Sequence, residues 1–299
     1  MDYQNITVAG SGVLGSQIAY QSAFKGFNVT VYDINDETLK NAQDRITKLK
    51  PLYQKDLGAT QEEVNAAYAR LSFKSDLSEA VANADLVIEA IPEVVTIKTE
   101  FYTNLGKVAP AKTIFATNSS TLLPSQFAEA TGRPEKFLAL HFANTIWKNN
   151  TAEIMKHPGT DMNVFDEVVK FALAIGMVPL PLYKEQPGYI LNSLLVPFLD
   201  AAESLLVKEI ADPETIDKTW MIATGAPLGP FAILDIIGIN TSLNIVEAKA
   251  AATNDESLNK LANLLRTKYI EKGKLGRASG EGFYKYPNPS FEKPDFLKG

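Results

Sequence analysis

The sequence contains no cysteine, two histidines and two tryptophans among its 299 residues. The absence of cysteine excludes disulfides, thiolate nucleophiles and cysteine-ligated metal sites, and it suits a reducing cytoplasm. Positive charge is also scarce, because 29 lysines and arginines stand against 35 aspartates and glutamates, a net charge of −6. An acidic chain without a basic stripe is not expected to bind nucleic acid or anionic membranes. We therefore expect a cytoplasmic protein with no metal site.

Signals for secretion and membrane insertion are missing as well. The first residues, Met1–Asn5, contain no basic region and no apolar stretch, so no secretory signal is expected. The most apolar long segment, Gly188–Val207, is interrupted by Asp200 and Glu203. It therefore indicates a buried helix and not a transmembrane span.

The first half of the chain alternates short apolar segments with amphipathic ones. The apolar segments predict strands at Ile6–Ala9, Asn28–Tyr32, Leu71–Phe73, Leu86–Glu89, Thr113–Thr117, Phe137–His141 and Val178–Pro181. The amphipathic segments predict helices at Leu14–Phe24, Asp36–Lys55, Gln61–Ala69, Val94–Val108, Pro124–Ala130 and Met162–Ile175. This alternation predicts an α/β domain of the Rossmann type, with a parallel, doubly wound sheet.

The second half of the chain has a helical pattern throughout. A segment rich in proline and glycine, residues 179–188, marks the junction, and we place the domains at residues 1–183 and 184–299. Helices are predicted at Leu191–Val207, Pro213–Thr224, Phe231–Ala252 and Ser257–Lys272. The second domain is therefore expected to be all-α, with an extended tail from Pro287 to Gly299.

A glycine-rich turn, Gly10-Ser11-Gly12-Val13-Leu14-Gly15, follows the first predicted strand and opens a helix. Gly10 would make the tight turn, Gly12 would admit a pyrophosphate, and Gly15 would let the helix pack on the strand. Val13 and Leu14 would then meet the phosphates at the helix N-terminus. The alternative is a tight turn that binds no nucleotide.

An acidic residue, Asp33, ends the second predicted strand. It stands close to the spacing of about 20 residues expected for the acid that binds the ribose hydroxyls. No arginine follows it closely, which favours NAD(H) over NADP(H). A second anchor is predicted after the fourth strand, where Ala90 precedes Glu93 and Lys98; the alternative there is a solvated helix start.

His141 ends an apolar run, and Glu153 follows within a second short apolar stretch. Imidazole can take a proton from a hydroxyl and return one to a carbonyl oxygen, and a carboxylate behind it fixes the tautomer. This requires the strand of Glu153 to pair beside that of His141. The alternative is a buried histidine that a neighbouring carbonyl satisfies, and His157, before Pro158, is expected in a turn.

Two further polar residues are candidates for binding a substrate oxygen. Ser120 follows the fifth predicted strand, where a helix N-cap is the alternative role. Asn192 stands on an otherwise apolar helix just past the junction. It would either reach into an interdomain cleft or make a hydrogen bond between helices.

These motifs together resemble the 3-hydroxyacyl-CoA dehydrogenase family over nearly the whole chain. The resemblance rests on the glycine turn and on the segments Ala84–Glu93, Thr117–Ser120, His141–Asn144, Pro187–Asn192, Gly225–Pro230 and Gly280–Tyr286. It implies that His141 is the general acid/base, that Glu153 orients it, and that Ser120 and Asn192 polarise the substrate's C3 oxygen. It implies NAD contacts from Asp33, Glu93, Lys98 and Asn144, and a homodimer formed through the helical domain.

The sequence departs from the family's motifs at two places beside these residues. The family's motif continues from Asn144 into a proline, where Thr145 stands here, and the family's asparagine is followed by arginine, where Ser193 stands. These departures leave the chemistry in place and open the question of the substrate. The residues of these motifs resemble those of the diketoreductase branch of the family. The L-gulonate dehydrogenase and λ-crystallin group is also similar.

The expected function is that of an NAD-dependent oxidoreductase interconverting L-3-hydroxyacyl and 3-ketoacyl compounds, with a CoA thioester as one candidate substrate. The alternative with the same chemistry is NADH-dependent reduction of free β-keto acids or esters. An alternative of another class is a non-catalytic NAD-binding or crystallin-like protein. Residues 41–70 would form the family's CoA-contacting hairpin, but Lys48, Lys50 and Lys55 there also fit a solvated face.

Overall fold

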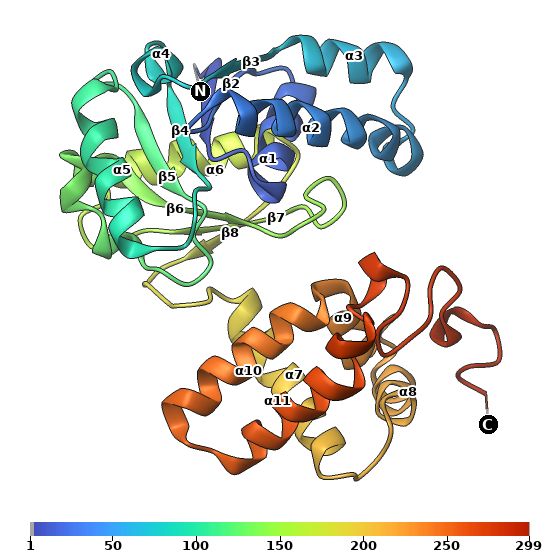
Figure 1. Ribbon diagram of the computed structural model, residues 1–299. Helices are drawn as coiled ribbons and strands as arrows, with labels where there is room; N and C mark the ends of the chain where they lie inside the picture. The colour runs from blue at the N-terminus through green and yellow to red at the C-terminus, as the bar shows by residue number, and fades with distance from the viewer. Residues whose placement is uncertain (1–2, 299) are drawn as a thin grey trace. The chain divides into compact units, whose positions relative to one another are not determined.

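The computed structural model describes residues 3–298 and divides into two compact units, the first ending at Leu191 (Figure 1). The predicted boundary after residue 183 lies shortly before this division. Met1, Asp2 and Gly299, at the ends of the predicted domains, lie outside the described residues.

The first unit is built on an eight-stranded sheet in the order β3-β2-β1-β4-β5-β6-β7-β8. The strands are β1 (Asn5–Ala9), β2 (Asn28–Tyr32), β3 (Leu71–Lys74), β4 (Leu86–Glu89), β5 (Ile114–Thr117), β6 (Phe137–Phe142), β7 (Thr151–Met155) and β8 (Val178–Leu182). β1 lies between β2 and β4, so the loops after β1 and β4 diverge. Such a switch point opens a crevice at the carboxyl ends of the strands.

One strand, β7, breaks the parallel pattern. It pairs with β6 in antiparallel orientation, whereas the other neighbouring strands are parallel. The connection between them, residues 143–150, is too short for the crossover of a dozen or more residues that a parallel pair requires. The predicted Rossmann-type fold with a doubly wound sheet is thus confirmed, and the sheet is parallel except at β7.

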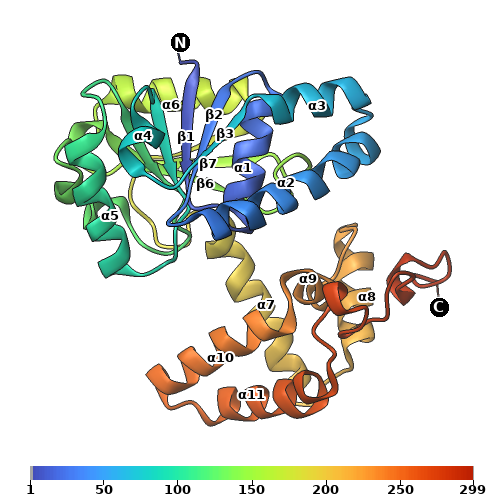
Figure 2. The ribbon, with the colours of Figure 1, turned by 45° about the horizontal axis from the view of Figure 1, so that its top comes forward.

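Helices cover both faces of this sheet, as Figure 2 shows for α4 and α5 on one side of the strands and α2 and α3 on the other. The helices are α1 (Val13–Phe24), α2 (Asp36–Leu57), α3 (Gln61–Ala69), α4 (Leu77–Val81), α5 (Val95–Val108) and α6 (Met162–Ala174). The predicted helix Pro124–Ala130 is instead a pair of 3₁₀ turns, Pro124–Gln126 and Glu129–Thr131. Gly132, at φ +67°, ends the segment before a regular helix can form.

The second unit is helical, which confirms the predicted all-α domain. Its helices are α7, α8 (Pro213–Thr224), α9 (Pro230–Ile237), α10 (Ile239–Thr253) and α11 (Glu256–Lys268); α7 (Leu191–Val207) starts at the last residue of the first unit. The predicted single helix Phe231–Ala252 is broken at Gly238, whose φ of +96° lies outside the helical region. The tail is not simply extended, because Ser290–Glu292 form a 3₁₀ turn and Phe296 is buried.

No single helix in the described part of the chain is long and apolar enough to cross a membrane. Among the helices of residues 3–298, only α9 and α10 together reach that length and composition, and a bend of 99° separates them. At the start of α9, Phe231 and Ala232 are buried, and their N–H groups donate hydrogen bonds to Asp217.

Candidate active site

The glycine turn between β1 and α1 is shaped by what its glycines touch. A Cβ on Gly10, whose φ is +94°, would lie 2.4 Å from the carbonyl oxygen of Ala90. A Cβ on Gly15 would lie 1.9 Å from the carbonyl oxygen of Gly10. Nothing lies within 4 Å of the Cβ position at Gly12, so the turn is packed on the inside and open at its tip.

That open tip is the N-terminus of a helix. Gly12 is the N-cap of α1, and no side chain caps the N–H groups of the first turn. Uncapped N–H groups and the helix dipole together favour an anionic ligand such as a pyrophosphate. The residues present therefore fit the dinucleotide that the sequence predicts.

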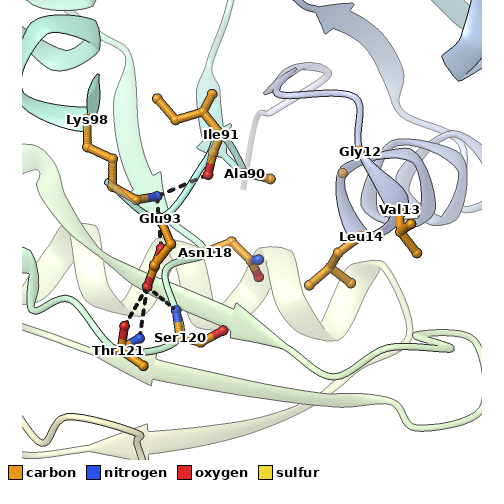
Figure 3. Close-up of a pocket in the computed structure, with 11 residues that line it drawn as sticks. Gly12, Val13, Leu14, Ala90, Ile91, Glu93, Lys98, Asn118, Ser120 and Thr121 are labelled. Atoms are coloured by element: carbon orange, nitrogen blue, oxygen red, sulfur yellow. Dashed lines mark hydrogen bonds and ion pairs between the residues drawn. The ribbon is translucent and has the colours of Figure 1, made fainter. Parts of the chain in front are cut away.

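A pocket of about 250 Å³ lies beside this turn. Figure 3 shows the turn and Leu14 on one side of it, Glu93 and Lys98 on the other, and Asn118 between them. The lining residues are Gly12, Val13, Leu14, Gly15, Ala90, Ile91, Glu93, Lys98, Asn118, Ser120 and Thr121. The structure thus brings most of the predicted cofactor residues to one cavity together with Ser120.

Asp33 lies at the end of β2 and is tied to the glycine turn. Its Oδ2 accepts hydrogen bonds from the Ser11 N–H at 2.7 Å and the Ser11 hydroxyl at 2.5 Å. A carboxylate has lone pairs to spare for ribose hydroxyls. Arg45, on α2, donates a hydrogen bond to the Ser11 carbonyl oxygen at 2.8 Å. It was not predicted as part of this site, because it does not follow Asp33 closely in the sequence.

Replacing Asp33 with alanine should weaken NADH binding by about 1–3 kcal/mol, because ribose hydroxyls and Ser11 would lose an acceptor. Wild-type protein should use NADH with much higher catalytic efficiency than NADPH, since the carboxylate repels a 2′-phosphate. Titration of NADH fluorescence and initial rates with both cofactors measure these effects. Comparable efficiency with NADPH would show that Asp33 does not select the cofactor.

Glu93 organises the loop that follows β5. Its Oε1 accepts hydrogen bonds from the N–H groups of Ser120 at 3.1 Å and Thr121 at 3.0 Å, and from the Ser119 hydroxyl at 2.5 Å. Burial raises the pKa of Glu93, but these hydrogen bonds and the charge of Lys98 outweigh it and lower the pKa to about 2. Glu93 is therefore a carboxylate that holds Ser120 in place, and its predicted contact with NAD stays a prediction.

Lys98 is 1% exposed, so the alternative of a solvated helix start is wrong for this residue. Its Nζ lies 2.5 Å from Oε1 of Glu89 and 3.3 Å from Oε2 of Glu93. Glu89 is fully buried at the end of β4 and also accepts hydrogen bonds from Tyr102 and Thr117. Sequence reasoning assigned no role to Glu89, because only the fold reveals its partners.

His141 and Glu153 face each other across the antiparallel pair of β6 and β7. The imidazole Nδ1 lies 2.9 Å from Oε2 of Glu153, and both residues are buried. The alternative, in which His141 makes its hydrogen bond to a backbone carbonyl, is therefore wrong. With Nδ1–H donated to the carboxylate, Nε2 is left to exchange protons, and it lies 3.2 Å from the Ser120 hydroxyl.

The second oxygen of Glu153 is also occupied. Oε1 accepts hydrogen bonds from the N–H groups of Ile190 and Leu191, each at 2.9 Å. Burial raises the pKa of Glu153, but the hydrogen bonds from His141 and from these N–H groups outweigh it, so the pKa is lowered. Glu153 thus remains an anion behind the imidazole, as stabilisation of an imidazolium requires.

Three other predicted residues lie apart from this cluster or outside its unit. Asn144 is exposed in the loop after β6, and its carbonyl oxygen accepts a hydrogen bond from Asn149. Asn192 belongs to the second unit, on α7, and its role stays a prediction. His157 lies in a turn as expected, with Nε2 2.9 Å from the Pro134 carbonyl oxygen.

A dinucleotide turn and a buried histidine–carboxylate pair fit a dinucleotide-dependent oxidoreductase, and comparison with known proteins gives the family. Residues 5–186 match the 3-hydroxyacyl-CoA dehydrogenase NAD binding domain, and residues 188–286 match the C-terminal domain of the same family. The chain belongs to the 3-hydroxyacyl-CoA dehydrogenase family. It is an NAD(H)-dependent oxidoreductase that acts on CH–OH groups.

Individual relatives cover nearly the full length. The chain is 34% identical over 288 residues to the human mitochondrial hydroxyacyl-coenzyme A dehydrogenase, and the matched region covers 95% of this chain and 91% of the human protein. It is 34% identical over 286 residues to a probable 3-hydroxybutyryl-CoA dehydrogenase of Bacillus subtilis, and this match covers 96% of this chain and 98% of the bacterial protein. A solved diketoreductase, described by its dual catalysis of dicarbonyl compounds, is 56% identical with a TM-score of 0.91, covering 96% and 100%.

Proposed function

We propose that this enzyme interconverts a 3-keto group and an L-3-hydroxy group, with a small β-dicarbonyl compound such as a β-keto acid or ester as its substrate. The observation that carries the chemistry is Nε2 of His141, 3.2 Å from the Ser120 hydroxyl, with Nδ1 held by Glu153. Bound NAD(H) supplies or accepts the hydride. The residues of the chain handle the proton.

In the direction of reduction, His141 begins as an imidazolium and donates the Nε2 proton to the oxygen that becomes the hydroxyl. Glu153 stabilises that cation, and the Ser120 hydroxyl donates a hydrogen bond to the same oxygen. In the direction of oxidation, neutral Nε2 accepts the hydroxyl proton. Burial of His141 and Glu153 keeps bulk water from screening their interaction.

The substrate class is argued first from the loop between β6 and β7. Thr145 has a φ of +63°, an outlier for a β-branched residue, and its N–H donates to Oε1 of Gln17 at 2.8 Å. Proline fixes φ near −65° and has no N–H, so the family's usual Asn-Pro motif cannot adopt this backbone. The loop that follows His141 therefore takes a path that the usual motif does not allow.

The same loop is fastened to the helix that the resemblance associates with CoA. The Trp147 indole N–H donates to Oδ2 of Asp56, near the end of α2, at 2.9 Å. Among the lysines of residues 41–70, Lys50 donates to Asn65 within the hairpin. These contacts occupy groups that could otherwise face a nucleotide tail, and they support a compact substrate, as does the 56% identity to the diketoreductase.

Replacing Thr145 with proline should lower kcat/KM for a β-keto ester by about 10-fold, the scale of one lost hydrogen bond plus a shifted loop. NADH binding should change less than turnover, because no residue of this loop lines the pocket beside the glycine turn, although Asn144 is a predicted NAD contact. Thr145→Gly is the matched control, since glycine retains a positive φ and an N–H. Equal kinetics for the two variants would show that the loop path does not matter.

A second candidate substrate is a 3-ketoacyl-CoA thioester. It is supported by the names of the human and Bacillus subtilis relatives, which match nearly the whole chain. The proton chemistry would be identical, and only the groups that bind the rest of the substrate would differ.

Oxidation of NADH, followed by absorbance, decides between the two. Initial rates should be compared for a β-keto ester, a 3,5-diketo ester and acetoacetyl-CoA at matched concentrations. We expect a higher kcat/KM for the esters. A higher kcat/KM for acetoacetyl-CoA would replace the proposed substrate with the thioester, and NADH binding without turnover of any substrate would support a non-catalytic protein.

We also propose that the enzyme is a homodimer formed through its helical unit. Large apolar side chains are exposed on α7, α8, α9 and α10, among them Leu194, Ile222, Ile236 and Ile245. Leu194 is 70% exposed, and apolar surface of this kind is typical of an interface. Light scattering at micromolar concentration should give twice the mass of one chain. A monomer under those conditions would refute the proposal.

A further inference from the structure

The segment that follows the β8 strand contacts the whole catalytic cluster. Tyr189 is 1% exposed, and its ring is stacked on the imidazole of His141, with centroids 4.5 Å apart and planes at 17°. Its hydroxyl donates to the carbonyl oxygen of Ser119 at 2.8 Å, next to Ser120. One side chain therefore touches both the acid/base and the loop that carries the substrate-polarising hydroxyl.

The backbone of this segment explains how the ring reaches His141. Gly188 has a φ of +78° and Tyr189 a φ of +54°, so two successive residues lie in the left-handed region. The N–H of Tyr189 donates to the carbonyl oxygen of Gln186 and closes the turn. A residue with a Cβ adopts this conformation only where its surroundings impose it, and such residues cluster at functional sites.

The turn delivers a second set of contacts. The next two N–H groups, of Ile190 and Leu191, both donate to Oε1 of Glu153. The side chain of Tyr189 thus stacks on His141, while the backbone that follows it donates hydrogen bonds to Glu153. Displacement of this segment would disturb both members of the pair at once.

We propose that Tyr189 is a positioning residue that fixes the plane of the His141 ring for proton transfer; the proposal rests on the function proposed above. The two hydrogen bonds of the imidazole, between Nδ1 and Glu153 and between Nε2 and Ser120, leave the ring able to rock about the line that joins its two nitrogens. A ring stacked at 4.5 Å removes this freedom and keeps Nε2 aimed beside the Ser120 hydroxyl. The negative face of the phenol also favours the imidazolium that forms during turnover.

The test compares Tyr189→Leu with Tyr189→Phe, because phenylalanine keeps the stacked ring and leucine does not. We expect Tyr189→Leu to lower kcat by about 10²-fold, the cost of misplacing a catalytic group by roughly 1 Å, with the KM for NADH little changed. Tyr189→Phe should retain kcat within about 3-fold, since Glu93 also holds the Ser120 loop. Tyr183→Leu is the matched control, because Tyr183 is 81% exposed on the same connection and should keep its activity.

A spectroscopic readout separates this proposal from the proposed function. The chain has two histidines, so the ring protons of His141 and His157 can be followed individually by NMR. The ring-current shift of His141 should persist in Tyr189→Phe and vanish in Tyr189→Leu, while His157 reports an intact fold. Equal kcat for the leucine and phenylalanine variants, or an unchanged His141 shift in the leucine variant, would overturn the proposal whatever the true substrate is.

Discussion

Replacement of His141 with alanine should lower kcat by about 10²–10⁴-fold, the usual contribution of general acid–base catalysis. NADH binding should remain nearly intact, because His141 does not line the pocket beside the glycine turn. Stopped-flow or steady-state NADH oxidation gives kcat, and fluorescence titration gives the Kd of NADH. Both are measured on the same preparation.

The other histidine provides the control for this variant. The imidazole of His157 serves a turn, where Nδ1 accepts the Gly159 N–H and Nε2 faces the Pro134 carbonyl oxygen. His157→Gln should therefore cost some thermal stability and leave kcat largely unchanged. A His141→Ala enzyme that keeps half of the wild-type kcat would eliminate the proposed proton shuttle.

Replacement of Glu153 with glutamine should lower kcat for alcohol oxidation by roughly 10³–10⁴-fold, because it favours the wrong tautomer. The N–H groups of Ile190 and Leu191 require an acceptor, so the amide oxygen should turn toward them. The amide NH₂ then faces Nδ1 of His141, and the imidazole proton moves to Nε2. An Nε2–H cannot accept the proton of the substrate hydroxyl.

Loss of the charge has a separate effect on the pH dependence. Wild-type Glu153 is an anion with a lowered pKa, and it favours the imidazolium of His141. A neutral amide does not, so the lower limb of the pH–rate profile for alcohol oxidation should move to lower pH. A profile with an unchanged lower limb would leave His141 as the acid/base and remove Glu153 from the mechanism.

The sheet and most helices were predictable because their signals are local. Apolar runs such as Ile6–Ala9 and Leu86–Glu89 are short, buried and bounded by turn residues. The break at Gly238 was missed because the sequence on both sides is equally apolar, so periodicity continues across it. The strand of Glu153 was expected beside that of His141, but its antiparallel orientation was not predicted.

Within the site, residue types were predictable and long-range partners were not. The glycine turn, Asp33 and the His141–Glu153 pair were predictable from their spacing and from the apolar segments beside them. Lys98 was predicted beside the cofactor, but its burial was not, because that burial depends on Glu89 from β4. Tyr189 lies in a motif of the family resemblance, but its contact with His141 was not predicted, because that contact depends on left-handed backbone that the sequence does not specify.

Glu153 is expected to hold His141 in the tautomer with its proton on Nδ1. NMR of the protein labelled with ¹⁵N-histidine reports the tautomer of each imidazole directly, and two histidines give two resolved sets of signals. At a pH where His141 is neutral, we expect the Nδ1–H tautomer in wild type and the Nε2–H tautomer in Glu153→Gln. An Nε2–H tautomer in the wild type, or one tautomer common to both proteins, would contradict it.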